Sequence, residues 1–232
     1  MAETKINAQF SNLPRGAVNL NVEGRPVVEL AQGFGQMWRK SYRVRLEGTA
    51  VEPAQVSRVW RENFAKFWPP GNHLYTTPEG IAPGQTALLN LAMPGGMILA
   101  TGLRIVRVDD TSFTFMTLLG HMYAGVIIFS AYADAGTTVV QVEPLLRAGD
   151  PLFEITMRLG FGHTIEERFW HATLKSLAAH FGVDGKVEQH NELLDTRVQW
   201  ANVKNILYNA AIWSGLYVLT APLRAVGDLL RR

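Results

Sequence analysis

The chain has 232 residues, of which 47% are hydrophobic and 18% charged, and its formal charge is +2 at pH 7. This length and composition indicate a folded protein with one generous domain, or one domain with extensions. The lack of cysteine excludes disulfides, thiolate catalysis and thiolate metal sites. No long Lys/Arg run with interleaved aromatic residues occurs, so we expect no nucleic-acid partner. The first residues lack the pattern of a signal peptide, so we expect a cytoplasmic protein.

The first third of the chain predicts an arm, a strand and a helix. Residues 1–40 mix polar residues, glycine and proline with short apolar pieces, and we expect an extended arm lying over the domain. Tyr42 to Leu46 alternates apolar with charged residues, which predicts a strand. Residues 54–68 follow Pro53 and repeat apolar side chains at helical spacing, which predicts an amphipathic helix. The Pro-Pro-Gly sequence at 69–71 ends that helix.

The segment after Gly95-Gly96 predicts an antiparallel meander, because it is rich in β-branched and aromatic residues between Gly- and Asp-rich turns. Four strands are expected, at Met97–Val108, Ser112–Leu118, Tyr123–Ala133 and Thr137–Leu146. Both faces of the third strand are largely apolar, whereas a strand with one face in water alternates more cleanly. We therefore expect the N-terminal arm, the C-terminal tail or another subunit to cover the second face.

Two helices are predicted after the meander. Asp150-Pro151 is typical of a helix start and predicts a short helix to about Leu159. The sequence Thr164 to Glu167 matches a capping box and predicts a helix over 164–181 that turns an aromatic stripe toward the sheet. Residues 184–199 are polar and are interpreted as a linker or a loose helix.

The C-terminal region carries an uncharged run from 205 to 223, followed by arginines. Its length just reaches the ~20 residues of a membrane-spanning helix, but polar residues interrupt it. We expect residues 200–232 to associate with the domain, with another subunit or with a membrane interface, and we rank packing on protein first. Peripheral membrane contact through 204–232 stays open because amphipathic basic helices bind anionic lipid.

These elements predict an α+β fold in which a curved antiparallel sheet wraps around a long C-terminal helix. Their order, together with stretches such as 113–117, 120–122 and 125–131, resembles the START/polyketide-cyclase (SRPBCC, helix-grip) superfamily, closest to uncharacterised bacterial members. The resemblance covers about residues 41–181, so we expect an N-terminal arm at 1–40, a ligand-binding domain at 41–181 and a linker with a helical segment at 182–232. It implies a ligand class, such as lipids, sterols or polyketides, and no reaction.

The leading hypothesis for function is a protein that binds or carries a lipid-like or other hydrophobic small molecule between the sheet and the last long helix. A cyclase- or aromatase-type enzyme and a structural or assembly subunit, including a homo-oligomer, are the alternatives. No metal site, cofactor or catalytic residue is assigned. The candidate ligand-binding residues are Trp60, Phe64, Phe115, Phe129, Glu143, Phe169 and Trp170.

A few polar residues are weighed for chemistry. His121 and His163 lie at element ends, where each would act as a general base if paired with Glu143 or Glu166, although loop histidines in solvent are commoner. Glu166 falls within the apolar arc of the last helix, so it either faces a cavity or, more commonly, benefits from the helix dipole. Arg104, Glu143 and Arg147 are candidates to anchor a polar head group or, alternatively, form surface ion pairs.

Overall fold

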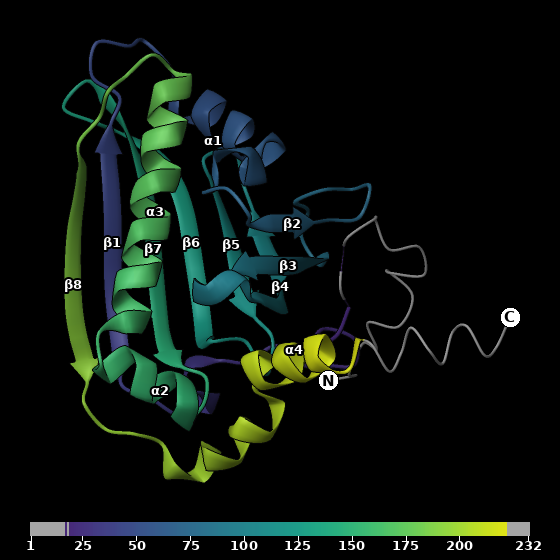
Figure 1. Cartoon of the computed structure of the whole chain (residues 1–232). Coiled ribbons are helices and arrows are strands. Elements are labelled where there is room, and N and C mark those ends of the chain that lie inside the picture. Colours follow the sequence, from purple (N-terminus) through teal and green to yellow (C-terminus); the bar gives the residue numbers. More distant parts are fainter. Residues whose placement is uncertain (1–16, 18, 222–232) are drawn as a thin grey trace, which may run out of the picture.

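The computed structural model describes residue 17 and residues 19–221. A single antiparallel sheet of eight strands, in the order β2-β3-β4-β5-β6-β7-β1-β8, curves around helix α3 (Figure 1). The strands are β1 (Met37–Arg45), β2 (His73–Tyr75), β3 (Thr86–Ala92), β4 (Ile98–Val108), β5 (Ser112–Thr117), β6 (Tyr123–Asp134), β7 (Thr137–Ala148) and β8 (Val187–Asp195). The α-helices are α1 (Pro53–Glu62), α2 (Pro151–Arg158), α3 (Phe161–His180) and α4 (Ala210–Leu219), and the 3-10 helices are η1 (Leu30–Gln32), η2 (Phe64–Phe67), η3 (Pro94–Gly96) and η4 (Trp200–Tyr208).

The predicted α+β class and the four-stranded meander are confirmed, and each strand lies within two residues of its expected limits. The strand expected at Tyr42 to Leu46 begins earlier, at Met37. The helix expected at 54–68 forms as α1 followed by η2. Its regular path stops at Asn63, whose backbone leaves the helical conformation and whose side-chain amide donates to the Val59 carbonyl at 3.0 Å.

The predicted capping box at Thr164 is wrong, because helix α3 starts one turn earlier, at Phe161. Gly160 adopts a left-handed conformation (φ 81°), which lets α2 turn into α3 with only two residues between them. The Thr164 hydroxyl donates to the Gly160 carbonyl inside the helix, at 2.9 Å. The Glu167 carboxylate instead accepts from the side chain of Asn191 on β8, at 2.8 Å.

The interpretation of residues 184–199 as a linker or loose helix is also wrong. Residues Val187–Asp195 form the edge strand β8, which pairs with β1 over nearly its whole length. Most of its side chains are exposed, so β8 has the polar composition of a loop and its strand pairing is set by β1. The sheet therefore continues beyond residue 181.

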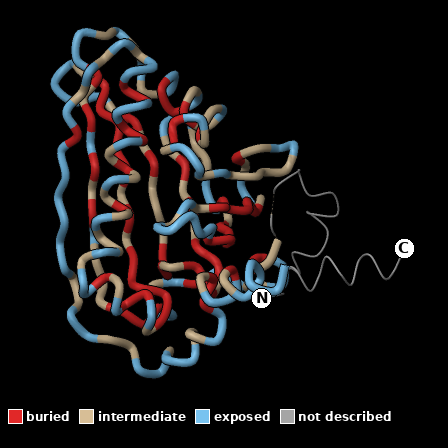
Figure 2. Tube along the Cα trace, viewed as in Figure 1, coloured by how far each residue is buried: buried red, intermediate tan, exposed pale blue. Residues whose placement is uncertain are grey.

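The core lies between the concave face of the sheet and the helices α1 and α3. Trp60 is fully buried there and makes edge-on ring contacts with Phe113 and Phe129, at 5.6 and 5.3 Å between centroids. Figure 2 shows buried residues concentrated along the central strands and the sheet-facing side of α3. Burial of large apolar side chains of this kind is the main stabilising contribution to such a fold.

The described residues before β1 lie across part of the second face of the sheet. The amide of Val28 donates to Thr117, and that of Phe34 donates to Ala148, both at 2.9 Å. Gly33 passes so close to β6 and β7 that an added Cβ would lie 2.8 Å from the Cβ atoms of Ala124 and Arg147. The arm thus covers the sheet where β5, β6 and β7 end or begin near α2.

The described part of the C-terminal segment packs on the same end of the domain. The side chain of Asn209 donates to the buried Asp150 at 2.7 Å, and the amide of Ala210 donates to Gly120 at 2.9 Å. Gly120 has φ of 99°, and a Cβ there would lie 2.2 Å from the Tyr208 carbonyl oxygen, so the close approach needs glycine. Within residues 19–221, no helix has the length and apolarity needed to cross a bilayer.

Candidate functional site

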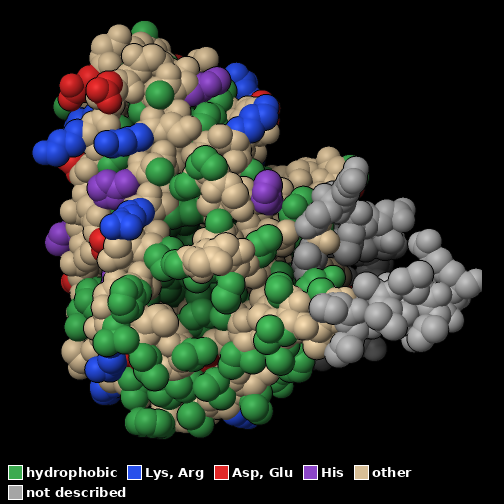
Figure 3. Space-filling model, in the orientation of Figure 1, with side chains coloured by type: hydrophobic (Ala, Val, Ile, Leu, Met, Phe, Trp, Pro, Cys, Tyr) green, Lys and Arg blue, Asp and Glu red, His purple; other side chains and the backbone are tan. Residues whose placement is uncertain are grey.

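A cavity of about 530 Å³ lies between α3, η2 and the strands β3 to β6. In the space-filling view the surface is hollowed at this place, and hydrophobic side chains line the hollow (Figure 3). Volumes of this order are typical of sites for small molecules. The cavity walls include Phe64, Trp68, Leu89, Leu91, Met93, Leu103, Phe115, Met122, Ile127, Phe129, Phe169 and Trp170.

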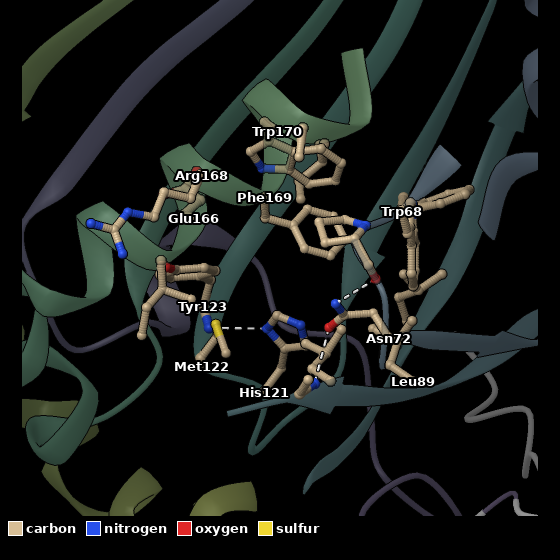
Figure 4. A pocket seen from close by; sticks show the side chains of 18 of the residues that line it. Trp68, Asn72, Leu89, His121, Met122, Tyr123, Glu166, Arg168, Phe169 and Trp170 are labelled. Carbon is tan, nitrogen blue, oxygen red and sulfur yellow. Dashed lines mark hydrogen bonds between the residues drawn. The ribbon is translucent and has the colours of Figure 1, made fainter. Parts of the chain in front are cut away.

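Aromatic rings form the most continuous part of the wall. Phe169 projects from α3 toward Trp68, with ring centroids 5.2 Å apart and an edge-on arrangement (Figure 4). Trp170 contacts Phe129 at 5.5 Å, and Phe64 contacts Phe129 at 5.0 Å. These edge-on contacts hold each ring in one orientation. The rings therefore form a continuous apolar part of the wall between η2, the sheet and α3.

Five of the seven candidate ligand-binding residues line this cavity: Phe64, Phe115, Phe129, Phe169 and Trp170. Trp60 does not, because it is fully buried in the core behind Phe64 and Phe129. Glu143 does not either. It follows Val142, whose side chain is in the core, and successive strand residues point to opposite faces. Its carboxylate accepts from Gln141 on the outer face of β7, at 3.0 Å.

Glu166 brings a carboxylate to the wall of this apolar cavity. Its Oε2 accepts from the Lys40 ammonium at 2.8 Å, and relative exposures are 0% for the Lys40 side chain and 4% for Glu166. Burial raises the pKa of Glu166, while the neighbouring Lys40 opposes that rise. Its second oxygen, Oε1, is buried and has no hydrogen-bond partner among the described residues. Such an atom is costly to bury unless something else bonds to it.

The two histidines weighed as bases are in different environments. His121 is buried in the cavity wall, contrary to the solvent-exposed interpretation, and its Nδ1 accepts from the amide of Tyr123 at 3.0 Å (Figure 4). Burial lowers the pKa of His121 to about 4. His163 does not line the cavity. It packs edge-on against Trp38, and burial lowers its pKa to about 4 as well.

Several wall residues were missed by sequence reasoning. Trp68 was placed in the helix without a role, yet its ring lines the cavity and its buried Nε1 has no partner among the described residues. Met122 lies in the β5–β6 turn and Tyr123 begins β6, and neither was proposed as a ligand-binding residue. Lys40 could have been found, because strand alternation puts it on the same face as the buried Tyr42.

The two arginines considered as head-group anchors do not line the cavity. Arg147 is buried and donates to the carbonyls of Gly35 and Arg197, at 2.7 and 3.0 Å, and to the Asp195 carboxylate at 2.6 Å. It therefore joins β7 to the arm and to the end of β8. Arg104 donates to the hydroxyl of Thr86 on the neighbouring strand β3, at 3.1 Å.

Comparisons with known proteins found no matching family model and no matching curated protein. Several solved structures align with part of the chain. Protein Ms6760 from Mycobacterium smegmatis aligns over 61% of this chain and 89% of its own, with 12% identity and a TM-score of 0.44. The di-domain ARO/CYC StfQ from the steffimycin biosynthetic pathway aligns over 64% and 53%, with 13% identity and a TM-score of 0.47. Major latex-like protein 151 from Panax ginseng aligns over 63% and 99%, with 12% identity and a TM-score of 0.44.

At these identities and TM-scores, the fold of the chain is described from its own architecture. The architecture of the chain itself consists of a continuous antiparallel sheet, from β2 to β8, curved around the 20-residue helix α3. An apolar cavity lies between that helix and the sheet. The chain has the helix-grip fold that the resemblance implied.

Proposed function

We propose that the protein binds or carries a hydrophobic small molecule in the cavity between α3 and the sheet. The observation that carries this proposal is a preformed space of about 530 Å³ whose wall is mainly aromatic and aliphatic. Filling such a space removes apolar surface from water on both the guest and the wall. An interior of this size also weighs against a purely structural subunit, for which we expect side chains to fill the core.

The guest, in our proposal, is lipid-like and carries one hydrogen-bond donor such as a hydroxyl or an amine. The buried Oε1 of Glu166 is an acceptor without a partner among the described residues, and it belongs to a residue of the cavity wall. A donor on the guest would satisfy this atom, and hydrogen bonds to charged groups are among the stronger ones. The apolar part of the wall would recognise only size and shape.

A cyclase- or aromatase-type enzyme is the second candidate, because a carboxylate and a histidine both belong to the wall. General acid–base catalysis works best when the pKa lies near the working pH. The pKa of His121 is about 4, so the neutral ring is a weak base, and the Glu166 carboxylate is engaged by Lys40. Both features favour binding over proton transfer. Chemical conversion of a bound guest, detected by mass spectrometry, would reverse this ranking.

Two experiments test the binding proposal. Native mass spectrometry of protein purified without detergent should detect an apolar guest. Fluorescence titration with 1-aminoanthracene, an apolar amine, should show saturable binding that Ile127→Trp weakens by roughly tenfold or more, because the added ring fills the cavity. Ile127 lines the cavity, whereas Ile128 pairs with Glu143 and points to the other face, so Ile128→Trp is the matched control. Equal binding by the two variants would contradict the cavity as the site.

The donor requirement has its own test. The double variant Lys40→Met/Glu166→Leu removes the carboxylate without leaving either charge alone in the core. It should lose affinity for 1-aminoanthracene but keep its affinity for anthracene. Glu143→Gln, outside the cavity, should change neither affinity. If the double variant binds both compounds as the native protein does, the proposed hydrogen bond between the guest and Glu166 is contradicted. The proposal that the guest occupies the cavity would be unaffected.

A further inference from the structure

One end of the molecule carries an exposed hydrophobic surface formed by α2, the start of α3, η4 and α4. Figure 1 shows α2, η4 and α4 together at the end opposite to α1, and Figure 3 shows hydrophobic side chains gathered over this end. We call this surface the apolar end face. Six of its side chains are 60 to 76% exposed: Leu159, Phe161, Trp200, Leu207, Val218 and Leu219. Contiguous exposed apolar surface on a protein usually marks a site of interaction.

The face is held in place by hydrogen bonds on its inner side. Ser214 of α4 accepts from the Ala100 amide at 3.0 Å, and Asn209 bonds to Asp150 at 2.7 Å. In η4, Asn202 donates to the carbonyls of Ala31 and Gly33, at 2.8 and 2.9 Å. Three polar side chains of this segment, Asn202, Asn209 and Ser214, thus point inward, while several of its large apolar side chains are exposed. An ordinary surface helix turns its apolar side chains toward the core.

The apolar end face is continuous with the wall of the cavity. Met93 and Met122 line the cavity, and both pack in the same apolar cluster as Ala210 and Ala211 of α4. The unbranched side chains of methionine adapt readily to different neighbours. Apolar contacts within this cluster therefore link residues of the cavity wall to α4.

Charges around the face are predominantly positive. The cations Arg158, Arg197 and Lys204 are exposed at this end, whereas its carboxylates, Asp150, Glu154 and Asp195, are largely buried. Arg158 bonds to Glu154 and Arg197 bonds to Asp195. Glu154 is buried and is bonded by Arg158 at 2.7 Å, so it presents little negative charge to solvent. In addition, the sequence that follows the described residues contains three arginines and one aspartate. This balance is complementary to an anionic surface.

We propose that the apolar end face docks on the surface of an anionic lipid bilayer. The short helices α4 and η4 would lie in the interface with their leucine and aromatic side chains among the acyl chains, and the cations would meet the head groups. Trp213 and Tyr217 of α4 are of the residue types that are enriched at the interface between lipid and water. Two copies joined symmetrically through the same face would instead bring like charges together.

Docking would also turn the Met93–Met122 part of the cavity wall toward lipid. A hydrophobic guest could then pass between the bilayer and the cavity without crossing water. This consequence rests on the proposed binding function, whereas the docking itself rests only on the apolar end face and its charges.

The test is co-sedimentation of the full chain with vesicles of phosphatidylcholine alone or mixed with phosphatidylglycerol. We expect binding to the mixed vesicles, weaker binding to the neutral ones, and loss of the difference in high salt. The triple variant Leu159→Gln/Leu207→Gln/Leu219→Gln should weaken binding by about tenfold or more, since three apolar side chains no longer enter the interface. Lys204→Glu should weaken binding to the mixed vesicles only.

The matched control is Val106→Gln, which changes an apolar residue that is 40% exposed on β4. Val106 lies eight residues from the α4 end of its strand, roughly 26 Å away, and should have no effect. Failure of the native chain to bind either vesicle would overturn the proposal, and so would a self-association that the triple variant abolishes. Vesicle binding together with failed 1-aminoanthracene binding would instead support docking and contradict the cavity proposal.

Discussion

The Lys40 ammonium on β1 donates to the Glu166 carboxylate on α3 at 2.8 Å, and both side chains are excluded from water. This ion pair joins the sheet to the long helix at the wall of the cavity. Removal of charges from water is unfavourable, and their mutual attraction offsets that cost only while both are present. The pair therefore joins β1 to α3 and makes Glu166 dependent on Lys40, whereas Lys40 also lies 3.7 Å from the partly exposed Glu167 carboxylate.

The first prediction concerns this dependence. Lys40→Met should lower the free energy of unfolding by about 3–5 kcal/mol, because Glu166 is left as an uncompensated buried charge. The double variant Lys40→Met/Glu166→Leu should recover most of that loss. Urea denaturation of the two variants and the native protein measures both values. Additive effects of Lys40→Met and Glu166→Leu would show that the two residues do not interact energetically.

The second prediction compares two cavity aromatics. Phe129 is fully buried at the centre of the aromatic cluster, so Phe129→Ala should cost about 3–5 kcal/mol. Phe169 is only partly buried at the cavity, so Phe169→Ala should cost less stability while lowering affinity for 1-aminoanthracene. His190→Ala, on the exposed edge strand, should stay within about 0.5 kcal/mol. Denaturation midpoints in the reverse order would contradict the described core.

The third prediction is a pH dependence of stability. The pKa of His121 is about 4 in the folded protein, below its ordinary value of 6.5. Between these values the unfolded chain binds more protons than the folded one, so stability falls as the pH drops from 6.5 toward 4. His163 acts in the same direction. His121→Gln, whose side chain can still accept from Tyr123, should flatten this dependence, as measured by thermal unfolding at pH 7 and pH 5. An unchanged slope would mean that His121 is accessible to protons.

The fourth prediction concerns the contact between α4 and the sheet. Strand β4 extends beyond the end of β5, and the free N–H and C=O of Ala100 bond to Ser214 and Asn21, at 3.0 and 2.6 Å. Ser214→Ala should cost about 1–3 kcal/mol by leaving a buried donor unpaired. Hydrogen exchange of the Ala100 amide should become faster. Ser176→Ala, on the exposed side of α3, is the control and should leave that exchange unchanged.

Much of the fold follows from patterns within single segments. The β-branched and aromatic runs at 97–108, 112–118, 123–133 and 137–146, and the turns between them, predict the meander, because strand preference and turn chemistry are local. The aromatic spacing of α1 and η2 likewise predicts which face is buried. Five of the seven proposed cavity residues belong to such stripes and do line the cavity.

Other features depend on contacts between distant segments, which one-dimensional patterns do not contain. Val187–Asp195 has the composition of a loop. It forms a strand because the edge of β1 has backbone N–H and C=O groups that would otherwise be unpaired. Glu143 is a carboxylate like Glu166, but the alternation of side chains along β7 places it on the outer face of the sheet, away from the cavity. Lys40 and Glu166 are 126 positions apart, and the curvature of the sheet brings them together. The sequence by itself determined the four-stranded meander, the long helix and the apolar stripe, whereas only the tertiary structure decided the edge strand β8 and which polar atoms reach the cavity.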